Sequence, residues 1–330
     1  MSKQNVVLLA GGVGGAKLAE GLAALNKRVN LTVIGNVADD DEFHGLWVSP
    51  DIDTLTYSLA DLIDRDKGWG LKEDPCNALS MLTSLGQDTW MNLGDKDFGL
   101  HIFRTLKRLK GERPQVIAAE IGRSLGVDAT LVLPTDDVIQ TRVKTAQGWI
   151  SFQEYFVRER CQPTVLALEI AGIDKAQPTP ESLAAIAEAD VIVIAPSNPL
   201  VSINPILSVV GIREALQMRK VPAVAVSPFI GGKTVKGPAD KMMQAMGFDP
   251  SGPGVATYYD GLIDALLIDS GDSQESEALE ALGIMVGTAD TLMQSLADKA
   301  QVAESVIDLA ERCDFTLSPE NLSSGERALA

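Results

Sequence analysis

Histidine and cysteine are scarce in this sequence. Its 330 residues include two histidines and three cysteines. The cysteines, Cys76, Cys161 and Cys313, are far apart and form no CxxC pair, so neither a disulfide framework nor a cysteine–histidine zinc site is expected. A small number of scattered cysteines is typical of a reducing compartment, and we expect a cytoplasmic protein.

Long apolar runs are absent, and basic residues are in the minority. No run approaches the ~18 residues of a membrane-spanning helix. The short apolar stretch at residues 6–10 leads at once into glycines, as a strand entering a loop does and a signal peptide does not. The chain has 28 Lys and Arg against 45 Asp and Glu, a net charge of −17. So acidic a surface repels a phosphate backbone, which argues against a nucleic-acid partner.

What the sequence does contain is an alternation of short apolar runs with helical patterns. Six runs predict strands, at residues 6–10, 31–34, 164–170, 190–195, 222–227 and 262–268. Helices are expected from Ala16, from Asp74-Pro75 and across residues 290–312. The predicted fold is α/β, a Rossmann-like doubly wound parallel sheet, with a largely helical insertion at roughly residues 55–125. We expect one domain over residues 1–330, with a mobile tail at 323–330.

A glycine-rich segment, AGGVGGAK, occupies residues 10–17. Glycines let the backbone approach a phosphate closely, and the following helix start supplies N–H donors. The segment departs from GxGxxG because Lys17 replaces the third glycine, and from a P-loop because GK[ST] is missing. The next strand ends in Gly35-Asn36 without the acidic residue that reads an NAD ribose. Anion binding without NAD or P-loop chemistry is one interpretation; a tight turn that packs helix on sheet is the other.

Acidic residues gather in three segments, NVADDD (36–41), SPDIDT (49–54) and WMNLGDKD (90–97). Each can be a solvated turn, and Asp51 or Asp53 can cap a helix. Alternatively, carboxylates two residues apart in an extended loop can share a site and hold Mg²⁺. The loops at 195–203 and 227–239 follow apolar strands and carry Ser, Asn and Gly. Because strand ends of one sheet share an edge, a single crevice could gather several of these segments.

Several longer segments carry a family resemblance: AGGVGGAKLAEGL, GNVADDDEFHGLWVSPDIDTLTYSLADLIDRDKGWG, TWMNLGDKDFGLHI, APSNPLVSINPILSVVGIREAL, AVSPFIGGKTVKGPADKMM and GTADTLM. Together they resemble the 2-phospho-L-lactate transferases, over residues 6–312. The resemblance implies a homodimeric, Mg²⁺-dependent enzyme. It would move a phospho-acyl group from a guanosine-diphosphate-linked acid, of the lactate or enolpyruvate type, to the ribityl hydroxyl of the deazaflavin Fo, and release GMP.

The resemblance also assigns roles to residues. Asp53 and Asp51 would be catalytic, and Asp53, Asp39 and Asp40 would bind the metal. Trp69, with Trp47, would stack on the deazaflavin, which Asp53, Asn92 and Asp95 would also contact; the family often has a basic residue at position 92. The nucleotide would be held by Gly11, Gly12, Val13, Gly14, Gly15, Lys17, Asn36, Pro196, Ser197 and Asn198.

Two other functions fit parts of the pattern. A nucleotide-sugar-binding regulator of the related gluconeogenesis-factor-like group would share the glycine segment, but SPDIDT and LGDKD argue against it. A dehydrogenase would need the missing third glycine and ribose-binding acid.

Overall fold

The computed structural model describes residues 3–313; the predicted mobile tail lies outside them. Its centre is a sheet of seven strands in the order β14-β13-β10-β9-β1-β2-β5, and every pair is parallel. The α/β, Rossmann-like prediction is confirmed. In chain order the strands are β1 (Gln4–Ala10), β2 (Val29–Gly35), β5 (Thr130–Val132), β9 (Val191–Ile194), β10 (Ala223–Val226), β13 (Ala265–Asp269) and β14 (Met285–Ala289).

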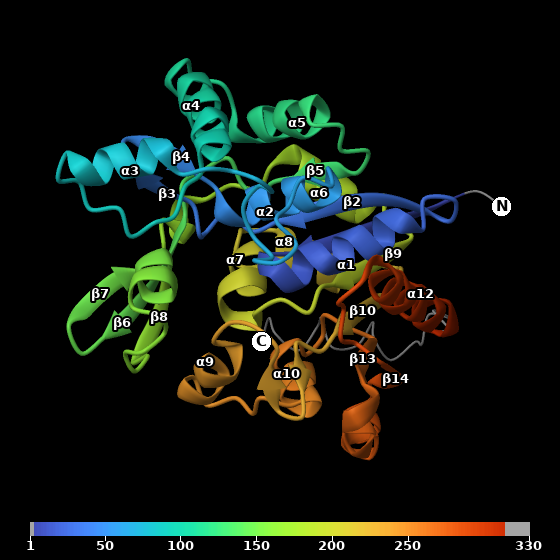
Figure 1. Cartoon of the computed structure of the whole chain (residues 1–330). Coiled ribbons are helices and arrows are strands. Elements are labelled where there is room, and N and C mark those ends of the chain that lie inside the picture. The colour runs from blue at the N-terminus through green and yellow to red at the C-terminus, as the bar shows by residue number, and fades with distance from the viewer. Residues whose placement is uncertain (1–2, 314–330) are drawn as a thin grey trace.

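Helices cover both faces of this sheet, which is why its central strands are continuously apolar. All four residues of β9 are buried, and so are those of β10. Helix α1 (Gly12–Ala24) packs between α2 (Pro50–Leu59) and α12 (Leu296–Arg312), whereas α6 (Pro180–Ala187) packs against α8 (Ile212–Gln217) (Figure 1). Right-handed crossovers place these two groups on opposite faces. No helix within residues 3–313 has the length and apolarity needed to cross a membrane.

The helical insertion is present between β4 and β5, but the helix predicted to begin at Asp74-Pro75 begins at Asn77. It contains α2, α3 (Asn77–Ser84), α4 (Asp95–Leu109) and α5 (Pro114–Ser124). Asp74 does not cap α3: its carboxylate accepts the N–H groups of Lys96 and Asp97, at the start of α4. Asp95 in turn accepts the N–H of Ala78, at the start of α3. The two helices therefore exchange caps, a tertiary arrangement that local sequence does not reveal.

Smaller elements stand beside the main sheet. The antiparallel sheet β7-β6-β8 consists of β6 (Gln140–Thr145), β7 (Gly148–Ser151) and β8 (Ala167–Ala171), and it projects away from the central layers in Figure 1. The hairpins are β3 (Asp41–Phe43) with β4 (Leu46–Val48), and β11 (Phe229–Ile230) with β12 (Lys233–Thr234). The remaining helices and helical turns are η1 (Glu154–Arg158), η2 (Ile173–Lys175), η3 (Pro199–Ile203), α7 (Asn204–Leu207), α9 (Ala239–Ala245), α10 (Gly252–Tyr258), η4 (Ser270–Glu275) and α11 (Ser276–Ala281).

The closing helix is shorter than predicted. Residues 290–295 are not helical; α12 begins after Ser295, whose side chain forms a capping box with Asp298. The strand β14 that precedes it was not predicted from the sequence.

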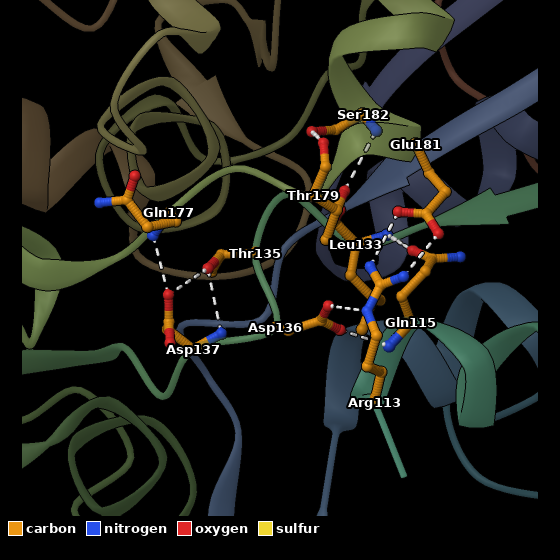
Figure 2. Close-up of polar contacts among 10 residues, drawn as sticks. All are labelled: Arg113, Gln115, Leu133, Thr135, Asp136, Asp137, Gln177, Thr179, Glu181 and Ser182. Carbon is orange, nitrogen blue, oxygen red and sulfur yellow. Dashed lines mark hydrogen bonds and ion pairs between the residues drawn. The ribbon is translucent and has the colours of Figure 1, made fainter.

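A polar network closes the β5 edge of the main sheet (Figure 2). The side chain of Gln115 imitates a neighbouring strand: it donates to the carbonyl of Leu131 at 3.1 Å and accepts the N–H of Leu133 at 2.6 Å. Thr179, the cap of α6, donates to the carbonyl of Leu133. Arg113 links Asp136 to Glu181 beside it. These hydrogen bonds and ion pairs join α5, β5 and α6.

Replacing Gln115 by alanine should lower the free energy of unfolding by about 2 kcal/mol, because it leaves one buried backbone donor and one acceptor unpaired. Urea denaturation would measure the loss. Gln301→Ala, on the exposed side of α12, is the matched control and should change stability by less than about 0.5 kcal/mol. Equal stability of the two variants would contradict the role given to Gln115.

Candidate functional site

A cleft of about 500 Å³ opens at the carboxyl ends of the central strands. It lies where β1 and β9 are neighbours, the point at which the strand order reverses direction. Ligands of doubly wound sheets bind at this place. Its wall includes residues after β1, β2, β9, β10 and β14, and these segments are far apart in the chain. The sequence-based expectation that one crevice gathers the strand-end loops is thus met in the arrangement of the backbone.

The glycine segment forms the start of α1 itself, not a loop before it. Gly11 is the N-cap residue, and Gly12 has a φ of +64°. A Cβ on Gly14 would lie 2.4 Å from the carbonyl oxygen of Pro196, so the first turn of α1 and the loop after β9 touch through backbone. The Ser197 hydroxyl accepts the N–H of Gly11 at 3.2 Å and donates to the carbonyl of Gly11 at 2.7 Å. The loop after β9 therefore fixes the junction between β1 and α1.

The start of α1 is suited to an anion. Its N-cap residue, Gly11, has no side chain to cap it, and its first turn carries no acidic residue, although the Asp51 carboxylate lies against the backbone of Gly11 and Gly12. Unpaired backbone N–H groups at a helix start attract negative charge. Lys17, in the second turn, also lines the cleft. Burial lowers the pKa of its ammonium group, and the nearby Lys299 and Lys236 lower it further.

Asp39 and Asp51 line the same cleft from the other side of the glycine segment. Asp51 accepts a hydrogen bond from the Asn36 amide at 2.9 Å. Burial raises the pKa of Asp51 to about 6. Burial, and then the charge of Asp51, raise the pKa of Asp39 well above its ordinary value. The Oδ1 atom of Asp39 is buried and has no partner within the described residues. A bound cation would offset the cost of burying these two negative charges close together.

This pair fits Mg²⁺ better than a metal that needs a full protein cage. Residues 3–313 contain no group of three or more His, Cys, Asp or Glu side chains arranged to hold a metal. Mg²⁺ usually binds through one or two carboxylates together with phosphate oxygens of the substrate and water. A metal at Asp39 and Asp51 would thus complete its coordination with water, or with phosphate oxygens when a substrate is bound.

Three other predicted acidic residues do not line the cleft. Asp53 is 4% exposed, and both of its oxygens bind the buried Arg104. The extended loop expected around Asp51 and Asp53 is wrong: α2 begins at Pro50. Residues two apart in a helix point about 200° apart, so the two carboxylates diverge. Asp40 accepts from Ser49 at 2.7 Å and from Trp47 at 3.0 Å, and Asp95 caps α3.

A largely apolar wall faces the acidic pair. The predicted residues Trp69, which is 40% exposed, and Asn92 both lie in it. Trp47 does not; its ring lies against Arg108 and its N–H against Asp40. Sequence reasoning missed Met91, Phe152, Gln153, Phe156 and Val157, which also line the cleft. Four of these follow β7, whose aromatic-rich continuation is indistinguishable in sequence from core.

The predicted site residues thus separate into three groups. Gly15 and Asn36 support the cleft from behind, through Ser197 and Asp51 respectively. Asp40, Asp53 and Asp95 point elsewhere. The cleft itself is lined by Gly11, Gly12, Val13, Gly14, Lys17, Asp39, Asp51, Trp69, Asn92, Pro196, Ser197 and Asn198.

Comparison with known proteins covers nearly the whole chain. Residues 6–308 match the family described as 2-phospho-L-lactate transferase CofD. The 2-phospho-L-lactate transferase of Methanosarcina acetivorans is 38% identical over 304 residues, which is 92% of this chain and 98% of that protein. The phosphoenolpyruvate transferase of Streptomyces coelicolor is 37% identical over 313 residues, 93% and 98% of the two chains. A solved structure of a upf0052-family protein from Bacillus halodurans shares the fold, with a TM-score of 0.61 and 20% identity, over 93% of this chain and all of that one.

Proposed function

Because the chain belongs to the 2-phospho-L-lactate transferase family, we propose that it transfers a phospho-acyl group from a guanosine-diphosphate-linked acid to the ribityl hydroxyl of Fo. The hydroxyl oxygen attacks the β-phosphorus of the donor, the bond to the bridging oxygen breaks, GMP leaves, and the hydroxyl proton is released. The observation that carries this proposal is the cleft, which combines the start of a helix, two buried carboxylates and an aromatic wall.

The proposal gives each wall of the cleft one task. Backbone N–H groups at the start of α1 bind the donor phosphates, while Pro196, Ser197 and Asn198 border the nucleoside. Asp39 and Asp51 would hold Mg²⁺, which supplies positive charge to the pyrophosphate. Trp69, Asn92 and the Phe152–Phe156 pair, whose rings stack at 5.7 Å, would bind the deazaflavin. A metal role for Asp53 stays a prediction and would require Arg104 to release its carboxylate.

Incubation with Fo, the guanosine-diphosphate ester of lactate or enolpyruvate, and Mg²⁺ tests the function directly. We expect GMP and a product whose mass equals that of Fo plus the phospho-acyl group. Calorimetry should show GDP binding and no NADH binding. An Fo fluorescence signal that stays flat on titration of folded protein, together with no product, would argue against the proposal.

The acidic pair predicts how Mg²⁺ stabilises the protein at different pH. Folding raises the pKa of Asp51 from 3.8 to about 6, so its contribution to stability is present below about pH 4 and is lost as pH rises through about 6. A bound cation opposes that loss. We expect about 10 mM Mg²⁺ to raise the Tm by about 3 °C or more near pH 7.5, and by less than about 1 °C near pH 5. Differential scanning fluorimetry would show it, and an equal rise at both pH values would contradict the site.

We also propose that the protein acts as a cytoplasmic homodimer. The three cysteines are free, as expected in a reducing compartment. Apolar side chains of α4 are exposed, with Leu106 at 53% and Leu109 at 79%, a pattern that supports a protein–protein contact. Light scattering would report the mass, and a monomer at micromolar concentration would count against the dimer.

A further inference from the structure

The cleft is lined by both acidic and basic side chains. Asp39 and Asp51 carry its negative charges, and the basic residues in its wall are Lys17 and Lys236. Within residues 3–313, neither lysine forms an ion pair with a carboxylate, whereas Glu20, the acidic neighbour that raises the pKa of Lys17, is already paired with Lys299 and Arg65. Two ammonium groups in one cleft of a strongly acidic chain leave positive charge for a ligand to neutralise.

Lys236 lies on the segment that follows the β11–β12 hairpin. Its Nζ donates to the backbone carbonyl of Lys67 at 2.6 Å, across the opening of the cleft. This partner is neutral, so the bond satisfies a donor without neutralising the charge. Gly68 lies between the two walls: a Cβ placed there would be 3.3 Å from the Lys236 Nζ and 3.5 Å from Val13 of the glycine segment. Lys236 therefore sits where the glycine segment meets the loop that carries Trp69.

The segment around Lys236 is anchored at its base, and at its tip the Thr234 hydroxyl donates to the carbonyl of Gly237 at 2.8 Å. Both oxygens of the buried Asp272 accept the N–H of Gly231, at 2.9 and 3.0 Å. Gly231, Gly232 and Gly237 have positive φ angles on either side of the tip. Lys236 itself is exposed. Rotation of its side chain can thus exchange the Lys67 carbonyl for an anionic group in the cleft without moving the anchored hairpin.

We propose that Lys236 binds the carboxylate of the acid that is being transferred. This inference rests on the proposed function. The donor's phosphates would be bound by the start of α1 and by a cation held at Asp39 and Asp51. The transferred acid must lie between the nucleotide and the acceptor, which is the junction that Lys236 occupies beside Trp69. Both lactate and enolpyruvate esters carry a carboxylate there, and an ammonium group is its complement.

Two donors and two lysine variants test this role. One donor is the guanosine-diphosphate ester of lactate, and the other is the isopropyl ester of GDP, in which a methyl group replaces the carboxylate. Lys236→Met should lower kcat/KM for the lactyl donor by roughly 10- to 100-fold, the scale of one charge-assisted hydrogen bond. It should change kcat/KM for the isopropyl donor, and the Kd for GDP, by less than about threefold. Lys236→Arg should restore part of the lactyl activity. Lys233→Met, on the same hairpin but outside the cleft wall, is the matched control and should behave as wild type.

The outcomes separate the alternatives. A similar loss with both donors would overturn the proposal and assign Lys236 to the phosphates. An unchanged lactyl rate would overturn it as well. Absence of turnover with either donor in the wild-type protein, with no GDP binding, would instead remove the proposed function and this inference with it.

Discussion

Asp51→Asn should reduce turnover by about 100-fold or more, the scale of losing one preorganised electrostatic group, and leave the fold at least as stable. Asp51 is buried in the cleft wall next to Asp39, and its pKa is raised by burial. The amide has nearly the same volume but carries no charge to attract the Mg²⁺ proposed to bind here. It also removes the cost of burying one carboxylate beside another, so stability near pH 7.5 should not fall.

The measurement pairs turnover with thermal denaturation of the same sample. Asp66→Asn, an exposed change in the loop before Trp69, is the control and should retain wild-type values of both. The Mg²⁺-dependent rise in Tm should also disappear in Asp51→Asn. A variant that keeps full activity and its response to Mg²⁺ would remove Asp51 from the metal site.

Arg104→Met should lower the free energy of unfolding by about 3 to 5 kcal/mol, because it leaves a buried carboxylate without its counter-charge. Arg104 is 5% exposed, and Asp53 binds it through both oxygens. The nearby His101 cannot replace it: burial lowers the pKa of its imidazole to about 4, so the ring is neutral near pH 7. The pair joins α4 to the first turn of α2, the turn from which Asp51 enters the cleft.

A double-mutant cycle separates loss of the pair from loss of packing. The double variant Asp53→Asn, Arg104→Met should recover a substantial part of the stability, since no unpaired charge is then buried. Urea denaturation of the two single variants and the double variant gives the coupling. Independent, additive losses would show that Asp53 and Arg104 do not act as a pair.

Local sequence signals predict the sheet well but not the direction of the site side chains. Five of the seven strands were found because buried parallel strands are short apolar runs, as at β9. The run predicted at residues 164–170 instead belongs to β8 of the small antiparallel sheet. Ser49-Pro50 carries the signature of a helix start. The sequence analysis nevertheless predicted an extended loop here, in which Asp51 and Asp53 would point to the same side. The partner that holds Asp53 is 51 residues away in sequence, on α4, and no local pattern connects the two.

The apolar wall of the cleft could not be predicted from the sequence for a similar reason. Phe152 and Phe156 follow a strand of the small sheet, and only the packing of that sheet beside the main one brings them to the cleft. Aromatic residues in a sequence indicate buried positions, but they do not show whether those positions pack in the core or line a cleft. The glycine segment was recognisable from sequence because only glycine, which has no Cβ, lets another backbone approach this closely.

The contact between Ser197 and Gly11 has a consequence for biosynthesis. The two residues are 186 positions apart, and β1 lies between β2 and β9 in the sheet. Translation at about 5–20 residues per second therefore separates their synthesis by roughly 10 to 40 seconds. During that interval β1 can pair with β2 but exposes its other edge, and the glycine segment has no Ser197 to hold it. Until β9 leaves the ribosome, an exposed apolar strand edge is therefore available to chaperones.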